Sequence, residues 1–359
     1  MSKNILELCL AHGLGGLEMF VAHCYDDFSK RGECKVVVAP QTKLDNYLEN
    51  IDKFSIKRNK FFPFIPALKL AKYIDENDID IVHFHWTKDI VTAVLAKFFS
   101  KKKPKLVQSR HMRMTRFKDD FYHRWLYKSV DLMHAVTKDV AKQLQKFIPQ
   151  TVRPKIEMIY LGVGVPSLDK KKIENLKEKY QFSDSFIVGI VGRIEEGKGQ
   201  HKVIEAVASL QNKNITALIV GSAMNETYLE KLKEKVHELG IEKRVIFTGF
   251  TKEVNEHMAL CDTVVLATEN ETFGLVVIEA MANKKAVIAT AKGGPLEIID
   301  DGVDGILFDG SAKDLSKKIE FLYEQKDIKK ELEENALKKI QEKFEKSKQL
   351  EKLYKVITA

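Results

Sequence analysis

Two basic side chains on a glycine-rich segment are the first residues suited to chemistry. Arg193 and Lys198 follow the apolar run 186–191 and stand between Gly192 and Gly199. Glycines at the end of a strand allow the backbone to approach a ligand closely, and a guanidinium beside an ammonium suits a diphosphate. Taken alone, the segment is also compatible with a helix-entry loop that carries two solvated cations.

Two glutamates eight positions apart form a second group. A helix is expected to begin near Gly274, which puts Glu271 in the loop before it and Glu279 about one and a half turns inside it. The N–H groups of residues 272–275 would then be available to an anion. Glu279 stands among apolar residues, and a buried carboxylate needs hydrogen-bond donors, which ligand hydroxyls or an internal cation could supply. A further glycine loop, Gly293-Gly294, follows on the same edge.

The first half offers a glycine loop and basic side chains that follow apolar runs. The loop Gly13-Leu14-Gly15-Gly16-Leu17-Glu18 has Glu18 at its sixth position, where a dinucleotide fingerprint requires glycine, so a hydride-transferring enzyme is not indicated. His85 ends one apolar run, and Arg110 and His111 end the next. Histidines at strand ends are often structural, so a ligand contact and a structural role both stay open for His85 and His111.

Length and composition indicate a globular protein of two domains. The chain has 359 residues, of which 44% are hydrophobic and 31% charged, and this suits neither a disordered nor a fibrous chain. No window resembles a membrane-spanning helix, and Glu7 interrupts the apolar start where a secretory signal would need its core. The four cysteines are Cys9, Cys24, Cys34 and Cys261. Because they include no C-x-x-C pair, we expect no zinc site, no disulfide framework and a cytoplasmic location.

The net charge of +8 comes entirely from the first 166 residues. A one-sided basic field suggests an anionic partner, which could be a membrane surface, a phosphorylated substrate or a nucleic acid; a solvated lysine-rich face is the alternative. Two basic segments, 57–66 and 110–128, also contain aromatic residues. In the second, Phe117, Phe121 and Trp125 would share one helical face. Such segments suit an anionic bilayer, although an aromatic stripe can also be packed core.

Short apolar runs alternate with stretches of helical length, which predicts parallel sheets with helices on both faces. The expected strands are 5–10, 35–39, 79–84, 105–108, 186–191, 215–220, 245–247, 263–267 and 286–289. The glycines and proline of residues 161–166 interrupt the alternation. We therefore expect two Rossmann-like, doubly wound α/β domains that face each other across a cleft. They would span residues 1–166 and 167–342, with a final helix of about 343–359 packed back on the first domain.

These motifs and their order resemble the retaining GT-B glycosyltransferases of glycosyltransferase family 4. The matching segments are Gly15-Gly16-Leu17-Glu18, Val191-Gly192-Arg193 with Lys198-Gly199, the E-x7-E stretch from Glu271 to Glu279, and Gly293-Gly294-Pro295-Leu296-Glu297. The resemblance extends over essentially the whole chain and is most specific at residues 186–310. It implies the GT-B fold and an enzyme that transfers a hexosyl-type sugar from a nucleotide-sugar donor.

The resemblance also implies roles for individual residues. The catalytic residues would be His111, Arg193, Lys198 and Glu271. The donor-binding residues would be Gly15, Gly16, Gly192, Arg193, Lys198, Thr272, Phe273, Gly274, Leu275 and Glu279, with the cations on the diphosphate and Glu279 on the ribose hydroxyls. The acceptor-binding residues would be Glu18, His85 and Arg110. Segments 220–222 and 249–251 would frame the base.

The mechanism that the resemblance implies needs neither a metal nor another cofactor. The donor would be a UDP- or GDP-sugar, and the acceptor a hydroxyl of a glycan or lipid-linked glycan in cell-envelope polysaccharide or lipopolysaccharide synthesis. The acceptor would attack from the leaving-group face, so neither Glu271 nor Glu297 is expected to act as a covalent nucleophile. The basic first half would bind the inner face of the cytoplasmic membrane peripherally.

Two other classes of protein stay open at this point. One is a sugar-nucleotide epimerase or another GT-B enzyme that acts without a glycan acceptor, and it would turn over the donor alone. The other is a non-enzymatic nucleic-acid-binding protein, which the charge alone suggests and which predicts salt-sensitive polynucleotide binding. This last class leaves the stretch from Glu271 to Glu279 unexplained, so we expect no nucleic-acid partner.

Overall fold

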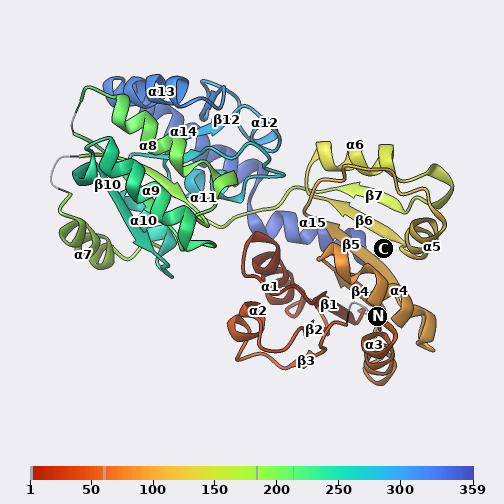
Figure 1. Ribbon diagram of the computed structural model, residues 1–359. Coiled ribbons are helices and arrows are strands. Elements are labelled where there is room, and N and C mark those ends of the chain that lie inside the picture. The colour runs from red at the N-terminus through yellow and green to blue at the C-terminus, as the bar shows by residue number, and fades with distance from the viewer. Residues whose placement is uncertain (1–2, 60–61, 183–184, 213) are drawn as a thin grey trace. The chain divides into compact units, whose positions relative to one another are not determined.

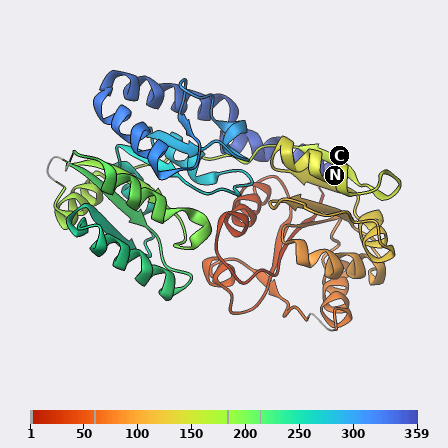
Figure 2. The same cartoon turned by 45° about the horizontal axis from the view of Figure 1, so that its top comes forward.

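A computed structural model describes residues 3–59, 62–182, 185–212 and 214–359, and the chain divides into two compact units. The first unit comprises the residues up to Leu161 together with Ser347–Ala359, and the second comprises Gly162–Lys346. Each unit is a parallel β-sheet with helices on both faces (Figure 1 and Figure 2). This confirms the doubly wound α/β architecture that the alternation of apolar runs predicted for both halves.

The first unit is built on a seven-stranded sheet in the order β3-β2-β1-β4-β5-β6-β7. Its strands are β1 (Ile5–Cys9), β2 (Cys34–Val38), β3 (Lys53–Ser55), β4 (Ile81–Phe84), β5 (Lys105–Arg110), β6 (Leu132–Ala135) and β7 (Lys155–Met158). Its helices are α1 (Gly16–Phe28), α2 (Lys43–Tyr47), α3 (Phe64–Glu76), α4 (Ile90–Phe99), α5 (Phe121–Ser129), α6 (Lys138–Phe147) and the C-terminal α15 (Lys346–Thr358). The strand order reverses at β1 and β4, and doubly wound sheets bind ligands at the carboxyl ends of strands beside such a reversal.

The last helix, α15, packs on the first unit although it ends the chain. The ring of Tyr354 lies 5.4 Å from that of Phe28 on α1, and the Arg31 guanidinium lies 5.5 Å from the Tyr354 ring centroid. The Lys105 ammonium donates a hydrogen bond of 3.0 Å to the carbonyl of Ile357. These contacts fix α15 beside α1 and the start of β5.

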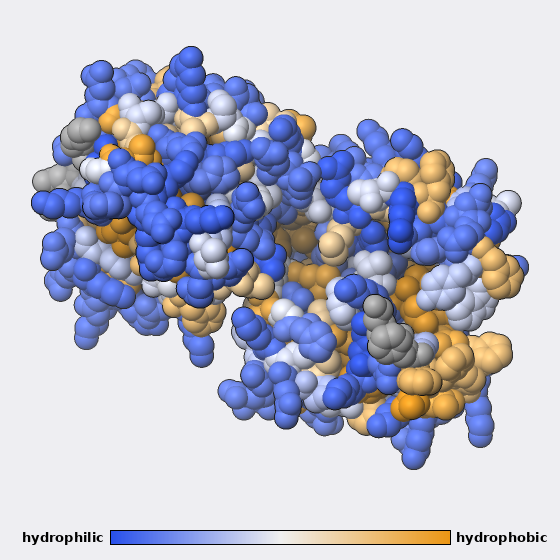
Figure 3. Space-filling view, viewed as in Figure 1, coloured by the Kyte–Doolittle hydropathy of each residue, from blue (hydrophilic) through white to orange (hydrophobic). Residues whose placement is uncertain are grey.

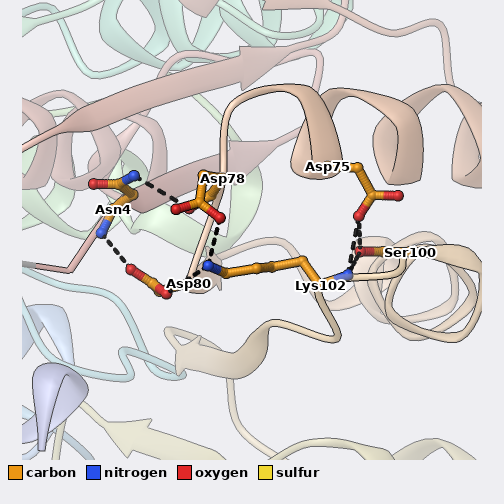
Figure 4. A network of polar contacts seen from close by, with 6 residues as sticks. All are labelled: Asn4, Asp75, Asp78, Asp80, Ser100 and Lys102. Atoms are coloured by element: carbon orange, nitrogen blue, oxygen red, sulfur yellow. Dashed lines mark hydrogen bonds and ion pairs between the residues drawn. The ribbon is translucent and has the colours of Figure 1, made fainter.

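A polar network ties the end of α3 to the loop after α4 (Figure 4). Asp75 accepts hydrogen bonds from the Ser100 hydroxyl at 2.6 Å and from the Lys102 N–H at 3.1 Å. The Lys102 ammonium lies 2.5 Å from Asp78 and 3.3 Å from Asp80. This network lies at the amino ends of β1, β4 and β5, whereas ligands of such sheets bind at the carboxyl ends. We therefore assign it a structural role.

The second unit is built on a six-stranded sheet in the order β10-β9-β8-β11-β12-β13. Its strands are β8 (Phe186–Val191), β9 (Ile215–Val220), β10 (Val245–Gly249), β11 (Thr263–Leu266), β12 (Ala286–Thr290) and β13 (Ile306–Phe308). Its helices are α7 (Lys170–Tyr180), α8 (Gln200–Ser209), α9 (Glu226–Glu238), α10 (Val254–Leu260), α11 (Leu275–Ala282), α12 (Pro295–Ile298), α13 (Ala312–Glu324) and α14 (Lys326–Lys343). The strand order reverses between β8 and β11, so the loops after these two strands define the expected binding edge.

All nine expected strands are present, and the structure adds β3, β6, β7 and β13 to them. The central strands are buried on both faces and read as continuous apolar runs; all six residues of β9 are buried, for example. Three of the four additional strands lie at sheet edges, and none of the four exceeds four residues. Such short segments carry too few apolar positions to stand out in the sequence.

The helical face predicted for Phe117, Phe121 and Trp125 is wrong, because α5 begins only at Phe121. Asp120 caps this helix by accepting a hydrogen bond of 3.1 Å from the His123 N–H. Phe117 precedes the cap, and its ring lies 5.3 Å from that of Phe147 on α6. Phe117 and Phe121 are both exposed, so they do not form packed core either.

Hydrophobic side chains gather on the surface of the first unit over α3 and α4 (Figure 3). This α3–α4 patch consists of the exposed residues Phe64, Ile65, Leu68, Phe98 and Phe99. A groove of about 470 Å³ lies beside it and is lined by Val94, Lys97, Phe98, Lys103, Trp125, Lys128 and Ser129. Exposed apolar patches of this kind mark interaction surfaces. None of the helices in the described parts of the chain is both long and apolar enough to cross a bilayer, and Lys60 and Phe61 of the segment 57–66 lie outside the described residues.

Candidate active site

The loop after β8 is locked to the loop after β9 by backbone contacts. Gly192 donates a hydrogen bond of 2.9 Å to Val220, and Ile194 donates one of 2.9 Å to Ser222. A Cβ atom on Gly221 would lie 1.9 Å from the Gly192 carbonyl oxygen, and Gly221 also has a φ of +142°, so only glycine fits there. The Gly221 N–H donates to Gly249 at 3.2 Å, which brings the two segments predicted to frame a base side by side.

The two cations of this loop differ in their surroundings. Arg193 is half exposed, and its guanidinium lies 3.1 Å from Glu195 on the same loop. Lys198 reaches across to the loop after β11, where its ammonium lies 3.3 Å from a carboxylate oxygen of Glu271. Two of the predicted catalytic residues, Lys198 and Glu271, are therefore neighbours. The sequence did not predict this pair, because 73 positions separate the two residues.

The second glycine loop packs directly on the segment that follows Glu271. The Gly294 N–H donates a hydrogen bond of 3.1 Å to the carbonyl of Glu271. A Cβ atom on Gly294 would lie 2.0 Å from the carbonyl oxygen of Phe273, and one on Gly293 would lie 2.3 Å from that of Glu271. The Gly293-Gly294 pair thus allows two backbone segments to touch, which holds Glu271 in place.

The start of α11 presents backbone donors at the same edge. Gly274 precedes the helix with a φ of +102°, no side chain caps it, and Leu275 is its first residue. The first N–H groups of a helix have no partner within it. Thr272 differs from the prediction, because its N–H already donates to Glu271 at 3.2 Å. Phe273 is buried and only its backbone reaches this edge.

Glu279 has no hydrogen-bond or ion-pair partner for its carboxylate among the described residues. It is half-buried on α11, and burial raises its pKa to about 7. The internal cation that the sequence left open as an alternative is not there in the described parts of the chain. A carboxylate that loses part of its hydration without gaining donors is unfavourable, so this side chain is suited to ligand hydroxyls.

The predicted acceptor residue Glu18 folds back on its own loop. Its carboxylate accepts a hydrogen bond of 2.9 Å from the Gly15 N–H, and Gly16 is the first residue of α1. A glutamate at the third helical position that bonds back to the N-cap N–H stabilises a helix start. In this structure Glu18 therefore shapes the Gly15-Gly16 loop.

Arg110 also has a structural position rather than the acceptor-facing one that was predicted. The side chain is 6% exposed. It donates to the carbonyls of Met112 and Arg113 at 2.8 and 3.1 Å and to the Thr87 hydroxyl at 2.8 Å. These bonds hold the loop that carries His111.

His85 lies below the surface rather than at the edge, with 1% of the residue exposed. Its ring bonds to Glu7 at 2.6 Å and contacts His111 at 3.5 Å. Phe20 of α1 covers both histidine rings, with centroid distances of 5.7 and 5.1 Å. Of the two predicted histidines, only His111 is partly exposed, and it is the one that can meet a ligand.

Four buried polar residues continue from this point into the sheet, and sequence reasoning missed them. They are Glu7 on β1, His83 on β4, Ser109 on β5 and His134 on β6. The sequence feature that could have revealed these residues is a charged or polar residue inside an otherwise apolar run. Glu7, Cys24 and His83 also present ligand atoms within 4.8 Å of one another. However, Glu7 and His83 already bond to each other at 2.9 Å, so these atoms are satisfied without a metal.

The second unit therefore brings one set of complementary groups to its carboxyl edge. Arg193, Lys198 and the start of α11 supply positive charge and N–H donors, and Glu279 supplies an unpaired acceptor. Cations and helix N-termini bind phosphates, and a carboxylate binds vicinal hydroxyls. A molecule with a diphosphate and a ribose carries both kinds of group.

Two family models match the chain one after the other. The model of Glycosyltransferase Family 4 matches residues 14–165, and the model of Glycosyl transferases group 1 matches residues 172–339. The first covers most of the first unit and the second most of the second unit. Together they account for nearly all of the chain.

Relatives and solved structures agree with these matches. EpsD of Bacillus subtilis (strain 168) is 29% identical over 338 residues, which cover 85% of this chain and 84% of EpsD. The capsular polysaccharide biosynthesis glycosyltransferase CapM of Staphylococcus aureus is 24% identical over 290 residues, 77% of this chain and 76% of CapM. The crystal structure of Anabaena HepE in complex with UDP and glucose has the same fold, with a TM-score of 0.87 at 23% identity and 100% of both chains covered.

Proposed function

The chain belongs to the GT-B glycosyltransferases of family 4, and on that basis we propose that it transfers a sugar from a nucleotide-sugar donor with retention of the anomeric configuration. The acceptor is a hydroxyl of a glycan or lipid-linked glycan in cell-envelope polysaccharide or lipopolysaccharide synthesis. CapM, whose name places it in capsular polysaccharide biosynthesis, supports this setting. The complex of HepE with UDP and glucose supports UDP as the first nucleotide to test.

The observation that carries the proposal is the unpaired carboxylate of Glu279 at the same edge as Arg193 and Lys198. Glu279 accepts hydrogen bonds from the ribose hydroxyls. Arg193, Lys198 and the free N–H groups at the start of α11 hold the diphosphate. The diphosphate gains negative charge as the anomeric bond breaks, and fixed positive groups stabilise this charge without reorganising.

The proposed retention follows from an acceptor that attacks on the leaving-group face, where the departing phosphate takes the hydroxyl proton. No covalent glycosyl-enzyme is required. Glu271 instead neutralises Lys198 until the diphosphate arrives, and it then contacts the donor sugar. The reaction uses no metal, so an excess of EDTA is expected to leave the transfer rate unchanged.

A nucleotide panel tests the donor site directly. UDP, GDP, ADP, CDP and dTDP are added separately, and the melting temperature is measured. A nucleotide at 100 times its Kd adds about 2.7 kcal/mol to the free energy of unfolding. For units of this size, each kcal/mol raises the melting temperature by about 2–4 °C, so the expected shift is roughly 5–11 °C. We expect UDP to give this shift and Arg193→Ala to lose it. If no nucleotide shifts the melting temperature, the proposed donor site is wrong.

Turnover assays separate the proposal from its alternatives. A transferase releases free nucleotide only when a glycan acceptor or, slowly, water takes the sugar. An epimerase converts the nucleotide-sugar itself, without an acceptor and without release of nucleotide. Isomerised donor in the absence of acceptor would therefore favour the epimerase, and tight polynucleotide binding that weakens steeply with salt would favour a nucleic-acid-binding protein.

We further propose that the α3–α4 patch binds an anionic membrane surface peripherally. The exposed aromatic rings of the patch lie beside the lysines of the groove, among them Lys103 and Lys128. Aromatic residues insert at the level of the lipid headgroups, and lysines attract anionic lipids. A lipid-linked acceptor would be delivered to the enzyme at such a surface.

The double variant Phe64→Ser/Phe98→Ser is expected to lower the partition onto vesicles with 30% anionic lipid by at least about tenfold. Each phenylalanine contributes roughly 1.5–3 kcal/mol when it leaves water, and both are exposed, so the fold is little affected. Phe321→Ser removes an exposed phenylalanine of the second unit and is the matched control. Cosedimentation measures the partition. Equal binding of the double variant and the control would contradict the proposal.

A further inference from the structure

The buried polar residues of the first unit form one continuous hydrogen-bonded chain that begins at His111. The chain has six contacts, which are His111 Nε2 to His85 Nδ1 (3.5 Å), His85 Nε2 to Glu7 Oε2 (2.6 Å), Glu7 Oε1 to His83 Nδ1 (2.9 Å), His83 Nε2 to Ser109 Oγ (2.7 Å), Ser109 Oγ to His134 Nδ1 (2.7 Å) and His134 Nε2 to the Ile159 carbonyl (2.7 Å). All members except His111 and Ile159 have at most 1% of their surface exposed. Water therefore does not substitute for any of these contacts.

The number of protons in this chain is fixed by its geometry. Each of the six contacts requires one proton, and the two ends differ, because the Ile159 carbonyl can only accept. Four neutral histidines and one serine hydroxyl supply five protons, and the carboxylate of Glu7 supplies none. The chain must therefore hold one additional proton. The negative charge of Glu7 balances it, so the buried group is neutral as a whole.

The additional proton lies in the contact between Glu7 and His83. His134 donates from Nε2 to Ile159, and burial lowers its pKa to about 3, so its Nδ1 carries only a lone pair. The Ser109 hydroxyl must then donate to His134, and its oxygen must accept from His83 Nε2. Burial acts to raise the pKa of Glu7, but the charge and hydrogen bonds of His83 and His85 outweigh it and lower the pKa to about 2. His83 thus donates from Nε2 to Ser109, and the additional proton lies between its Nδ1 and Glu7 Oε1.

The other arm of the chain fixes the tautomer of His111. Because Glu7 Oε2 only accepts, His85 must donate from Nε2. Burial, together with the charge of His83, lowers the pKa of His85 to about 4, so its Nδ1 carries a lone pair. His111 must then donate from Nε2 to fill the remaining contact. Burial, with His85 next in effect, holds the pKa of His111 well below its usual value, so the ring is neutral and its Nδ1 is an acceptor.

We propose that Glu7 is a positioning residue that acts through His85 to keep the proton of His111 on Nε2 and its Nδ1 as an acceptor for a substrate hydroxyl. The proposal rests on the proposed transferase function and deepens it. A phosphate oxygen has no proton to donate at neutral pH, whereas a sugar or acceptor hydroxyl has one. The tautomer therefore makes His111 select a hydroxyl rather than a phosphate.

The protonation of the histidine ring nitrogens can be observed directly in the intact protein. Two-dimensional NMR of protein labelled with ¹⁵N-histidine distinguishes Nδ1–H, Nε2–H and doubly protonated rings, and His111→Gln assigns the His111 signals. We expect the Nε2–H form of His111 at neutral pH. An Nδ1–H form of His111 in the unsubstituted protein would overturn the proposal.

We expect opposite effects on the His111 tautomer and on kcat from two substitutions of Glu7. Glu7→Gln can donate one amide N–H to His83 and keep one oxygen for His85, so all six contacts form from neutral groups. The tautomer of His111 then stays, and kcat changes by less than about threefold. Glu7→Leu removes both acceptors, so His111 becomes a mixture of tautomers. We expect kcat to fall by about tenfold or more while the KM for the donor stays within about twofold.

His85→Phe is the second breaking variant, in case Glu7→Leu does not fold. It removes the contacts of His85 with Glu7 and with His111 but leaves the Glu7–His83 pair in place. We expect the same tautomer mixture and the same loss of kcat. Ser109→Ala is the matched control, because it breaks the other arm of the chain and leaves the tautomer of His111 unchanged. A preserved Nε2–H form in Glu7→Leu or His85→Phe overturns the proposal.

The spectra require no substrate, so the two levels of the inference can fail separately. If the tautomers are as expected but no donor is turned over, the proposed function is wrong and the positioning by Glu7 stands. If transfer occurs but the tautomer of His111 does not depend on Glu7, the transferase stands and the positioning is wrong.

Discussion

Replacing Lys198 with alanine is expected to lower kcat/KM for sugar transfer by about 100- to 1,000-fold. The Lys198 ammonium lies 3.3 Å from Glu271, and 29% of its side chain is exposed. A partly exposed pair of this kind contributes about 1 kcal/mol or less to stability, so the ammonium can leave Glu271 for a phosphate at small cost. The loss of a fixed positive charge beside a developing negative charge is far larger, because it falls on the transition state.

The chain offers a closely matched control in Lys202. Its ammonium lies 2.7 Å from Glu269, in the first turn of α8 and beside the same two loops. Lys202→Ala therefore removes an ion pair of the same type, but outside the predicted site. Initial rates at saturating and limiting donor give kcat and kcat/KM for both variants, and we expect Lys202→Ala to change them by less than about threefold. Equal losses in the two variants would show that Lys198 acts only by supporting the loops.

The fold could be predicted from the sequence for most strands in the middle of a sheet, although the interior strand β6 was missed. Such strands, for example β8 and β9, are buried on both faces and read as unbroken apolar runs with glycines after them. The edge strands β3 and β13 could not be predicted, because each spans three residues and only pairing to a neighbour defines it. The helix expected through Phe117 begins only after the Asp120 cap, because a local capping bond outweighs an aromatic periodicity.

The candidate site could be predicted as a set of residues, but their partners could not. Lys198 and Glu271 belong to different loops, and they meet only because β8 and β11 are neighbours in the sheet. Glu18 matched the motif, yet a glutamate at that position also stabilises the start of α1, and the structure shows that bond. Glu7 was read only as a charge that interrupts an apolar start. Its two histidine partners lie 76 and 78 positions away, and the pairing depends on the register between β1 and β4.

Glu279 is expected to link nucleotide affinity to pH, with tighter binding as the pH rises. Burial raises the pKa of its carboxyl to about 7, and the ribose hydroxyls bind the ionised form as donors. Binding therefore releases a proton below pH 7, and the Kd of UDP should rise by up to tenfold for each pH unit below that value. Isothermal titration between pH 5.5 and 8.5 measures the profile, and Glu279→Gln should flatten it.

Glu279→Gln is also expected to weaken UDP binding at pH 8 by roughly 100-fold. Hydrogen bonds to a charged group contribute about 1.5–3 kcal/mol each, and a glutamine side chain accepts poorly from two hydroxyls. A nucleotide without the hydroxyls supplies the control. In the unsubstituted protein, 2′,3′-dideoxy-UDP should bind about as weakly as UDP binds to Glu279→Gln. In Glu279→Gln the two nucleotides should bind alike. If dideoxy-UDP remains much weaker in the variant, the hydroxyls bind elsewhere.

Glu279→Gln should also stabilise the protein in the absence of nucleotide. A carboxyl whose folded-state pKa lies above its unfolded value of about 4.3 destabilises the fold when it ionises. This cost grows as the pH rises from the unfolded value to about 7 and stays constant above it. The variant lacks this cost, which is up to about 4 kcal/mol, so its advantage in melting temperature should increase from pH 5 to pH 8. Suppose that Glu279→Gln binds UDP weakly, melts at a higher temperature than the unsubstituted protein, and shows a larger difference in melting temperature at pH 8 than at pH 5. Glu279 is then a group that lowers the stability of the fold in order to bind its ligand. A lower melting temperature of the variant at pH 8 would mean that the carboxylate supports the fold.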